Sequence, residues 1–143
     1  MADMPRSGTQ GPVRERDAPN DTPIHDFKDL DAWRVAMRLA KRVHVLTDQL
    51  SSSDRYGLSS QMRRAAVSIP SNIAEGYGRG ARQEYLRFLR IARGSAAELE
   101  TQLLLAAELG YVTDASDVQA LLKDVYRLLY GLIRSLSTRD GAT

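Results

Sequence analysis

The chain has 143 residues and a hydrophobic fraction of 43%, which is enough for one domain with a packed core. It contains no cysteine, which excludes disulfide bonds, thiolate nucleophiles and cysteine metal sites. No apolar run approaches the roughly 20 residues of a membrane-spanning helix, and the N-terminus has no apolar signal core, so we predict a cytoplasmic protein without membrane contact.

Residues 1–26 hold four of the five prolines and almost no large apolar side chains. Such a segment cannot bury enough surface to offset its ordering entropy, so we predict a flexible tail. Ile24 and Phe27 at its end leave a packed arm on a partner as an alternative. Helical periodicity then continues to about residue 138, and residues 139–143 are predicted to fray.

The first predicted helix, residues 29–50, carries an apolar arc that covers about half of its circumference. Trp33 and Met37 lie on its inner face, and Leu39 and Leu46 extend that face sideways. A single bundle core needs a narrower stripe, so we assign Trp33, Leu39 and Leu46 to a candidate subunit interface. For Trp33, core packing and a minor role as a base-stacking platform remain alternatives.

The second predicted helix begins near Gly57 and contains Pro70, whose ring removes a backbone donor and clashes with an earlier carbonyl, so we expect a kink. Residues 76–81 match a dinucleotide fingerprint in letters, but that fingerprint needs a preceding strand, and here a helix precedes it. We therefore interpret the segment as a hinge that reverses the chain. Its residues are Pro70, Gly76, Gly78 and Gly80.

The third and fourth predicted helices span residues 81–109 and 116–138. On the third, Leu86 and Leu104 point away from the inner stripe and join the candidate subunit interface. Four helices with short connections pack most simply as an antiparallel up-down-up-down bundle over residues 27–138. The surplus apolar surface predicts a homo-oligomer.

The net charge of +2 is unevenly distributed, because residues 33–93 contain twelve Lys or Arg against four Asp or Glu. Arginine suits phosphate and buried carboxylate equally well, so nucleic-acid binding and a merely solvated surface both remain open. On the third helix, Arg82, Arg90 and Arg93 share an arc of about 80°. The candidate nucleic-acid contacts are Arg63, Arg64, Arg79, Arg82, Arg87, Arg90 and Arg93.

Four segments carry a family resemblance: residues 55–58, 61–66, 68–79 and 98–103. The most specific is Ser-Ile-Pro-Ser-Asn-Ile-Ala-Glu-Gly at 68–76. In this order they resemble the four-helix-bundle proteins encoded in intervening sequences of bacterial 23S ribosomal RNA genes, also labelled ribosomal protein S23. The resemblance implies an up-down bundle assembled as a ring, typically a homopentamer, with no known enzymatic activity and a poorly defined molecular function.

A related bundle, the accessory protein of diversity-generating retroelements, is similarly pentameric and basic and binds nucleic acid and a reverse transcriptase. The present chain resembles the first group more closely. It departs from that group at Ala81, where a Ser or Thr often forms a capping box with a glutamate three residues on, here Glu84. The proline-rich tail also lies outside the family pattern.

No sequence pattern indicates catalysis. No glutamate is followed by a histidine three residues later, as a di-iron bundle would need, and His25 and His44 are far apart. Neither a Gly-x-Ser-x-Gly elbow nor a Walker lysine motif occurs. We therefore expect no enzyme activity, no metal and no cofactor. A weaker alternative places an enzyme site around Glu75, Tyr77 and Arg79, where Glu75 can pair with Arg79 one turn later.

The basic helices support two hypotheses. The leading one is a non-enzymatic oligomeric bundle that binds RNA or DNA through phosphate contacts on its basic helix faces. The alternative is a protein–protein scaffold whose arginines make intersubunit ion pairs, with no nucleic-acid role. Both require that the chain bind copies of itself, as a pentamer by resemblance.

Overall fold

The computed structural model describes residues 23–50 and 52–142. This part of the chain contains four long helices and no strand, which confirms the predicted all-α class. They are α2 (Asp31–Thr47), α3 (Tyr56–Gly78), α4 (Arg82–Glu108) and α5 (Ser116–Ala142). Three short 3-10 helices accompany them: η2 (Phe27–Asp29), η3 (Asp48–Leu50) and η4 (Ser53–Arg55). Most of the predicted tail lies outside the described residues, and α5 continues past the predicted end at residue 138 to Ala142.

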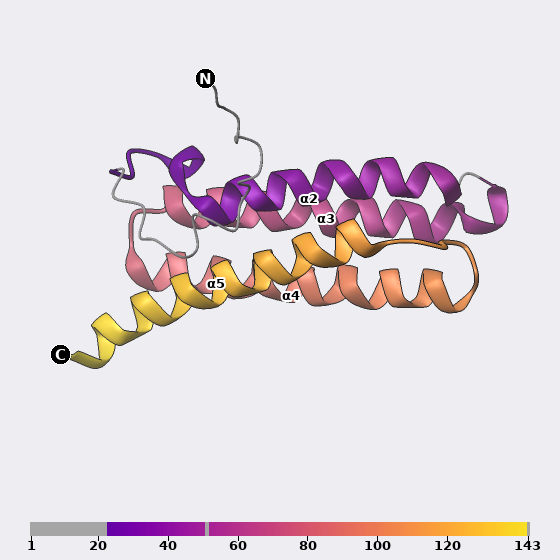
Figure 1. Ribbon diagram of the computed structural model, residues 1–143. Coiled ribbons are helices and arrows are strands. Elements are labelled where there is room, and N and C mark those ends of the chain that lie inside the picture. The colour runs from indigo at the N-terminus through magenta and orange to yellow at the C-terminus, as the bar shows by residue number, and fades with distance from the viewer. Residues whose placement is uncertain (1–22, 51, 143) are drawn as a thin grey trace, which may run out of the picture.

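The four long helices lie alongside one another, with connections that alternate between the two ends (Figure 1). α2 contacts α3 and α5, and α4 contacts the same two helices. Each helix therefore has two neighbours and buries a correspondingly broad face. The core that results contains side chains from all four helices. Its largest fully buried members are Leu39, Leu50, Met62, Ile69, Ile73, Leu86, Leu89, Leu99, Leu103 and Leu129.

Glycines end two of the helices in the left-handed conformation. Gly80 follows α3 with φ of 84°, and Gly110 follows α4 with φ of 76°. At the end of α4, the Gly110 amide donates to the Ala107 carbonyl at 3.0 Å, and the Tyr111 amide donates to the Ala106 carbonyl at 2.9 Å. This pair of bonds is a Schellman motif, which satisfies carbonyls that the helix leaves unpaired. The start of α4 lacks a side-chain cap at Ala81, as predicted.

Gly76 and Gly78 do not form the predicted chain reversal, because both lie within α3, which continues to Gly78. Pro70 lies inside the same helix, where its position was predicted. Gly76 is instead a contact point between helices, because a Cβ built on it would lie 2.6 Å from Phe88 Cβ on α4. Of the four predicted hinge residues, Gly80 alone has the left-handed backbone of a turn.

Polar side chains also join α3 to α4 about two turns before this contact. Ser68 Oγ lies 2.7 Å from Ser95 Oγ, and Asn72 Nδ2 donates to Ser68 Oγ at 3.0 Å and to the Ser68 carbonyl at 2.8 Å. Ser95 is buried, so its hydroxyl needs this partner. The serine, asparagine and glycine of the segment at 68–76 thus hold α3 against α4.

Candidate nucleic-acid and subunit interfaces

The first half of α4 presents a basic surface. Arg82, Arg87, Arg90 and Arg93 are all exposed, and Glu84 is the one acid between them in sequence. Arg87 and Arg90 help to line a shallow hollow of about 570 Å³ along the helix. Because these side chains project from three consecutive turns of one rigid helix, their spacing is fixed by the helix itself.

Arg63 is a structural residue of the single chain. Its Nε donates to Thr47 Oγ1 at 2.7 Å, and its Nη2 donates to Asp48 Oδ1 at 2.9 Å. Thr47 in turn is buried and donates to the Val43 carbonyl at 2.8 Å. These bonds link α3 to the C-terminal end of α2. Arg63, which we predicted as a nucleic-acid contact, therefore has hydrogen-bond partners within its own chain.

Arg79, which directly follows α3, and Arg87 on α4 both lie over the ring of Phe88. Their guanidinium carbons are 4.9 Å and 4.6 Å from its centroid, a distance typical of cation–π contact. Arg79 also pairs with Glu75 at 2.9 Å, as predicted, and Arg87 pairs with Glu84 at 3.3 Å. Both guanidinium groups therefore have partners within the chain, although both remain exposed.

Arg64, Arg90 and Arg93 differ from these three residues. All are exposed, and among the described side chains none of them has a carboxylate within ion-pair distance. Arg90 and Arg93 lie one turn apart on α4, whereas Arg64 is on α3. Arg82 occupies the first position of α4 and is also exposed.

The predicted subunit interface needs correction at three positions. Leu39, Leu46 and Leu86 are 0%, 5% and 2% exposed, so they belong to the core of a single chain and leave almost no surface for another copy. The cause is the two-neighbour packing described above, which uses a broad apolar arc within the chain. Trp33 is half-buried and packs edge-on against Phe27 at 5.2 Å. Leu104 is 52% exposed and remains available.

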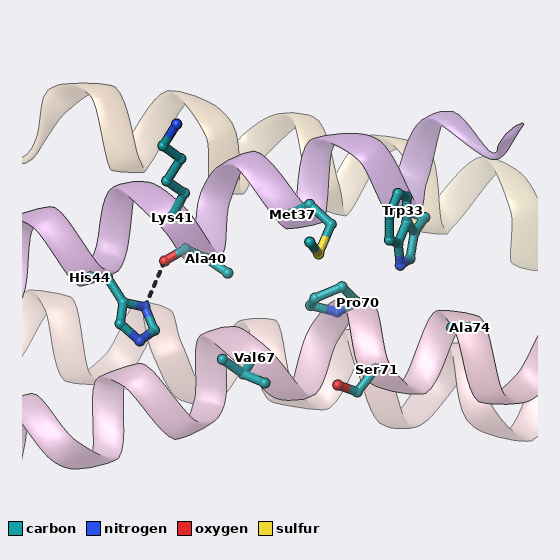
Figure 2. Close-up of a pocket in the computed structure, with 9 residues that line it drawn as sticks. All are labelled: Trp33, Met37, Ala40, Lys41, His44, Val67, Pro70, Ser71 and Ala74. Atoms are coloured by element: carbon teal, nitrogen blue, oxygen red, sulfur yellow. Dashed lines mark hydrogen bonds between the residues drawn. The ribbon is translucent and has the colours of Figure 1, made fainter. Parts of the chain in front are cut away.

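An apolar groove opens between α2 and α3 (Figure 2). It has a volume of about 440 Å³. In Figure 2, Met37 on α2 points toward Pro70 on α3, with Trp33 beside them and Val67 further along α3. Met37 and Val67 are each 46% exposed. The sequence analysis placed Met37 on the inner face and did not identify Val67. Val67 lies off the inner apolar stripe of α3, and this position could have indicated an exposed apolar residue.

His44 and Lys41 lie on the α2 side of the groove. His44 Nδ1 is 3.0 Å from the Ala40 carbonyl (Figure 2). A carbonyl can only accept, so Nδ1 carries the proton and Nε2 is an acceptor when the ring is neutral. Lys41 is exposed.

Two polar links hold α5 against its neighbours. Tyr126 on α5 donates its hydroxyl to Glu100 Oε1 on α4 at 2.8 Å, and burial together with this bond raises the pKa of Tyr126 to about 12. Arg42 on α2 donates through Nε to Asp117 Oδ2 at 2.9 Å and through Nη2 to the same oxygen. The hydrogen bond from Arg42 holds the pKa of Asp117 below its usual range.

The proposed enzyme site around Glu75, Tyr77 and Arg79 consists of residues with partners in the fold. Glu75 and Arg79 pair with each other, and Tyr77 packs edge-on against Tyr85 at 5.8 Å. Burial raises the pKa of Tyr85 to about 12, so its hydroxyl is protonated at neutral pH. Among the described residues, no three histidine or acidic side chains are grouped to hold a metal ion. None of the described helices is long and apolar enough to span a membrane.

The fold and these surfaces define an all-helical protein with arginines along one helix and an apolar groove between two others. Residues 28–132 match the family described as 23S rRNA-intervening sequence protein. The chain therefore belongs to the 23S rRNA-intervening sequence protein family, which confirms the resemblance found in its sequence. No curated protein matches it.

A solved structure with a similar fold is the crystal structure of a protein with unknown function from the S23 ribosomal protein family of Bacteroides thetaiotaomicron. The two chains are 25% identical, with a TM-score of 0.67. The alignment covers 71% of the present chain and 97% of the other.

Proposed function

We propose that the protein is a non-catalytic, cytoplasmic homo-oligomer of up-down-up-down bundles that binds the phosphate backbone of RNA or DNA through the first half of α4. The observation that carries the proposal is the pair Arg90 and Arg93, which lie exposed one turn apart with no carboxylate partner among the described side chains. By family resemblance, the assembly is a pentameric ring.

Binding of this kind depends on the charge of the phosphate backbone and does not distinguish base sequences. A helix face of arginines fits phosphate oxygens through charge-assisted hydrogen bonds. Oligomerisation strengthens the effect, because several identical arginine faces on one assembly engage one nucleic acid with increased avidity. Affinity should therefore fall steeply as the salt concentration rises.

The test is a binding titration with fluorescently labelled structured RNA and duplex DNA over a range of salt concentrations. The triple variant Arg82→Glu, Arg90→Glu, Arg93→Glu should lose at least tenfold in affinity and flatten the logarithmic salt dependence by roughly two to three units per bound chain. A matched control, Arg38→Glu, Lys123→Glu, Arg134→Glu, changes net charge equally at exposed positions on α2 and α5. Equal losses in both variants would mean that only net charge matters and would refute the proposed site.

The second candidate function is a protein scaffold whose arginines form ion pairs between subunits. This function is favoured by the ion pairs that Arg42, Arg63 and Arg87 form with acids of their own chain. In these pairs the arginines of this fold bind carboxylates. It predicts that the triple variant on α4 dissociates the oligomer. Light scattering on that variant distinguishes the two functions, since a phosphate-binding role leaves the assembly size unchanged.

A further inference from the structure

The groove between α2 and α3 has a basic rim. Lys41 lines it from α2, and Arg64 lies three residues before Val67 on α3, which places both on the same helix face. Of the acids close to the groove in sequence, Asp48 and Glu75 are paired with Arg63 and Arg79. Asp31 lies two residues before Trp33, which places it on nearly the opposite side of α2 from that groove residue. The groove is therefore an apolar floor bordered by positive charge.

The second half of α4 has the opposite character. Leu104, Leu105 and Leu109 are 52%, 48% and 51% exposed, and we call these three residues the α4 ridge. Residues 94–108 contain three glutamates and no lysine or arginine. Glu108 is exposed within the ridge segment, and Glu98 is exposed about 9 Å before Leu104 along the helix. Along α4 the ridge is therefore an apolar projection bordered by negative charge, and on its α5 side Lys123 lines a small hollow together with Leu104 and Glu100.

We propose that the groove of one copy binds the α4 ridge of a second copy. The inference rests on the oligomer in the proposed function and specifies which surfaces meet. Exposed leucines on a helix fit an apolar groove between two helices, and the charged borders are complementary. Contact also removes from water the partly exposed Met37, Val67 and ridge leucines, which a single chain leaves accessible.

The charges determine the symmetry of this contact. Groove against groove brings positive borders together, and ridge against ridge brings negative borders together, so neither surface complements itself. The favourable contact is heterologous, with a different surface on each copy. Every chain then offers one groove and one ridge, and successive copies close a ring when the rotation between them allows it.

Cysteine cross-linking tests the arrangement, because the chain has no natural cysteine. Val67→Cys lies in the groove and Leu105→Cys on the ridge. The two variants carry different affinity tags, are co-expressed and are treated with a short bismaleimide. We expect cross-links between the differently tagged chains, and at least fivefold fewer when either variant is expressed alone. Tyr130→Cys on α5, which is 58% exposed, replaces Leu105→Cys as the control and should cross-link to Val67→Cys no more than background.

The outcomes separate this inference from the oligomer itself. Cross-linking of either variant with itself at the mixed level would establish a symmetric contact and overturn the proposal. An oligomer by light scattering that gives no cross-link between Val67→Cys and Leu105→Cys would also overturn it, while the proposed oligomer stands. A monomer at micromolar concentration would overturn both, and RNA binding is judged by its own titration.

Discussion

Two helix contacts in this chain differ in how tightly they pack. The contact between α3 and α4 is tight, whereas the contact between α2 and α3 leaves a groove. α3 and α4 approach so closely at Gly76 that a side chain there would meet Phe88, and hydrogen bonds among Ser68, Asn72 and Ser95 complete the contact. α2 and α3 instead leave an apolar groove of about 440 Å³. The first contact is complete within one chain, whereas the second leaves apolar surface that a partner can cover.

Gly76→Ala should cause the largest loss of stability. The added methyl group must move the backbone-linked Phe88 Cβ, and overpacking of this kind costs about 1–3 kcal/mol. Gly78→Ala is the matched control, because nothing lies within 4 Å of a Cβ at Gly78 and the substitution favours the helix by up to ~1 kcal/mol. Urea unfolding at a fixed chain concentration measures both. Equal stability of the two variants would contradict the close contact.

Gly76 also shows what the sequence could not reveal. A glycine on a helix is indistinguishable in sequence from a glycine in a turn when other glycines follow at once, and the close contact depends on where α4 passes. The positive φ of Gly80 and Gly110 was predictable, because each follows the last periodic residue of a helix. Helix bounds were therefore predictable to within a few residues, but the role of Gly76 was not.

The candidate interfaces were harder to predict for a related reason. The width of the apolar arc on α2 was correct, but Leu39 and Leu46 are buried within one chain, because α2 contacts both α3 and α5. Sequence periodicity shows which residues are apolar and not how many neighbours cover them. Likewise, the arginine surplus of residues 33–93 does not distinguish Arg63, which bonds to Thr47, from Arg90, which faces solvent.

Val67→Asp should weaken association without unfolding the chain. A carboxylate in the groove loses hydration when a second copy covers it, which costs at least the about 1–3 kcal/mol of a neutral polar group, or a loss in association of at least roughly 5- to 150-fold. Unfolding should change little, since Val67 is already 46% exposed. Val45→Asp on α2, at a position 56% exposed and outside the groove lining, is the control. Light scattering against concentration would show equal dissociation of both variants if the groove were not an interface.

Charge reversal on both borders should have a smaller and compensating effect. Exposed ion pairs contribute about 0.2–1 kcal/mol each, so Lys41→Glu with Arg64→Glu should weaken association several-fold, and Glu98→Lys with Glu108→Lys should do the same. Combining all four substitutions restores opposite charges and should recover most of the loss. Additive losses in the quadruple variant, measured by analytical ultracentrifugation, would mean that these borders do not meet.

An exposed ion pair between Arg42 and Asp117 links α2 to α5. We expect the smallest effect on stability from breaking this pair. The Arg42 guanidinium lowers the pKa of Asp117 in the folded chain. At pH values above the usual pKa of 3.8, the ionised carboxylate therefore stabilises the folded chain. This contribution is lost as the pH falls through the lowered folded pKa. Asp117→Asn should cost roughly 0.5 kcal/mol at pH 7, because both side chains are about half exposed and water screens the pair. The difference from the unmodified chain should shrink as the pH falls below 3.8 and should vanish below the lowered folded pKa. In an Arg42→Gln background the same substitution should have a smaller effect, and an unchanged effect there would assign the stabilisation by Asp117 to the helix start of α5 rather than to the link with α2.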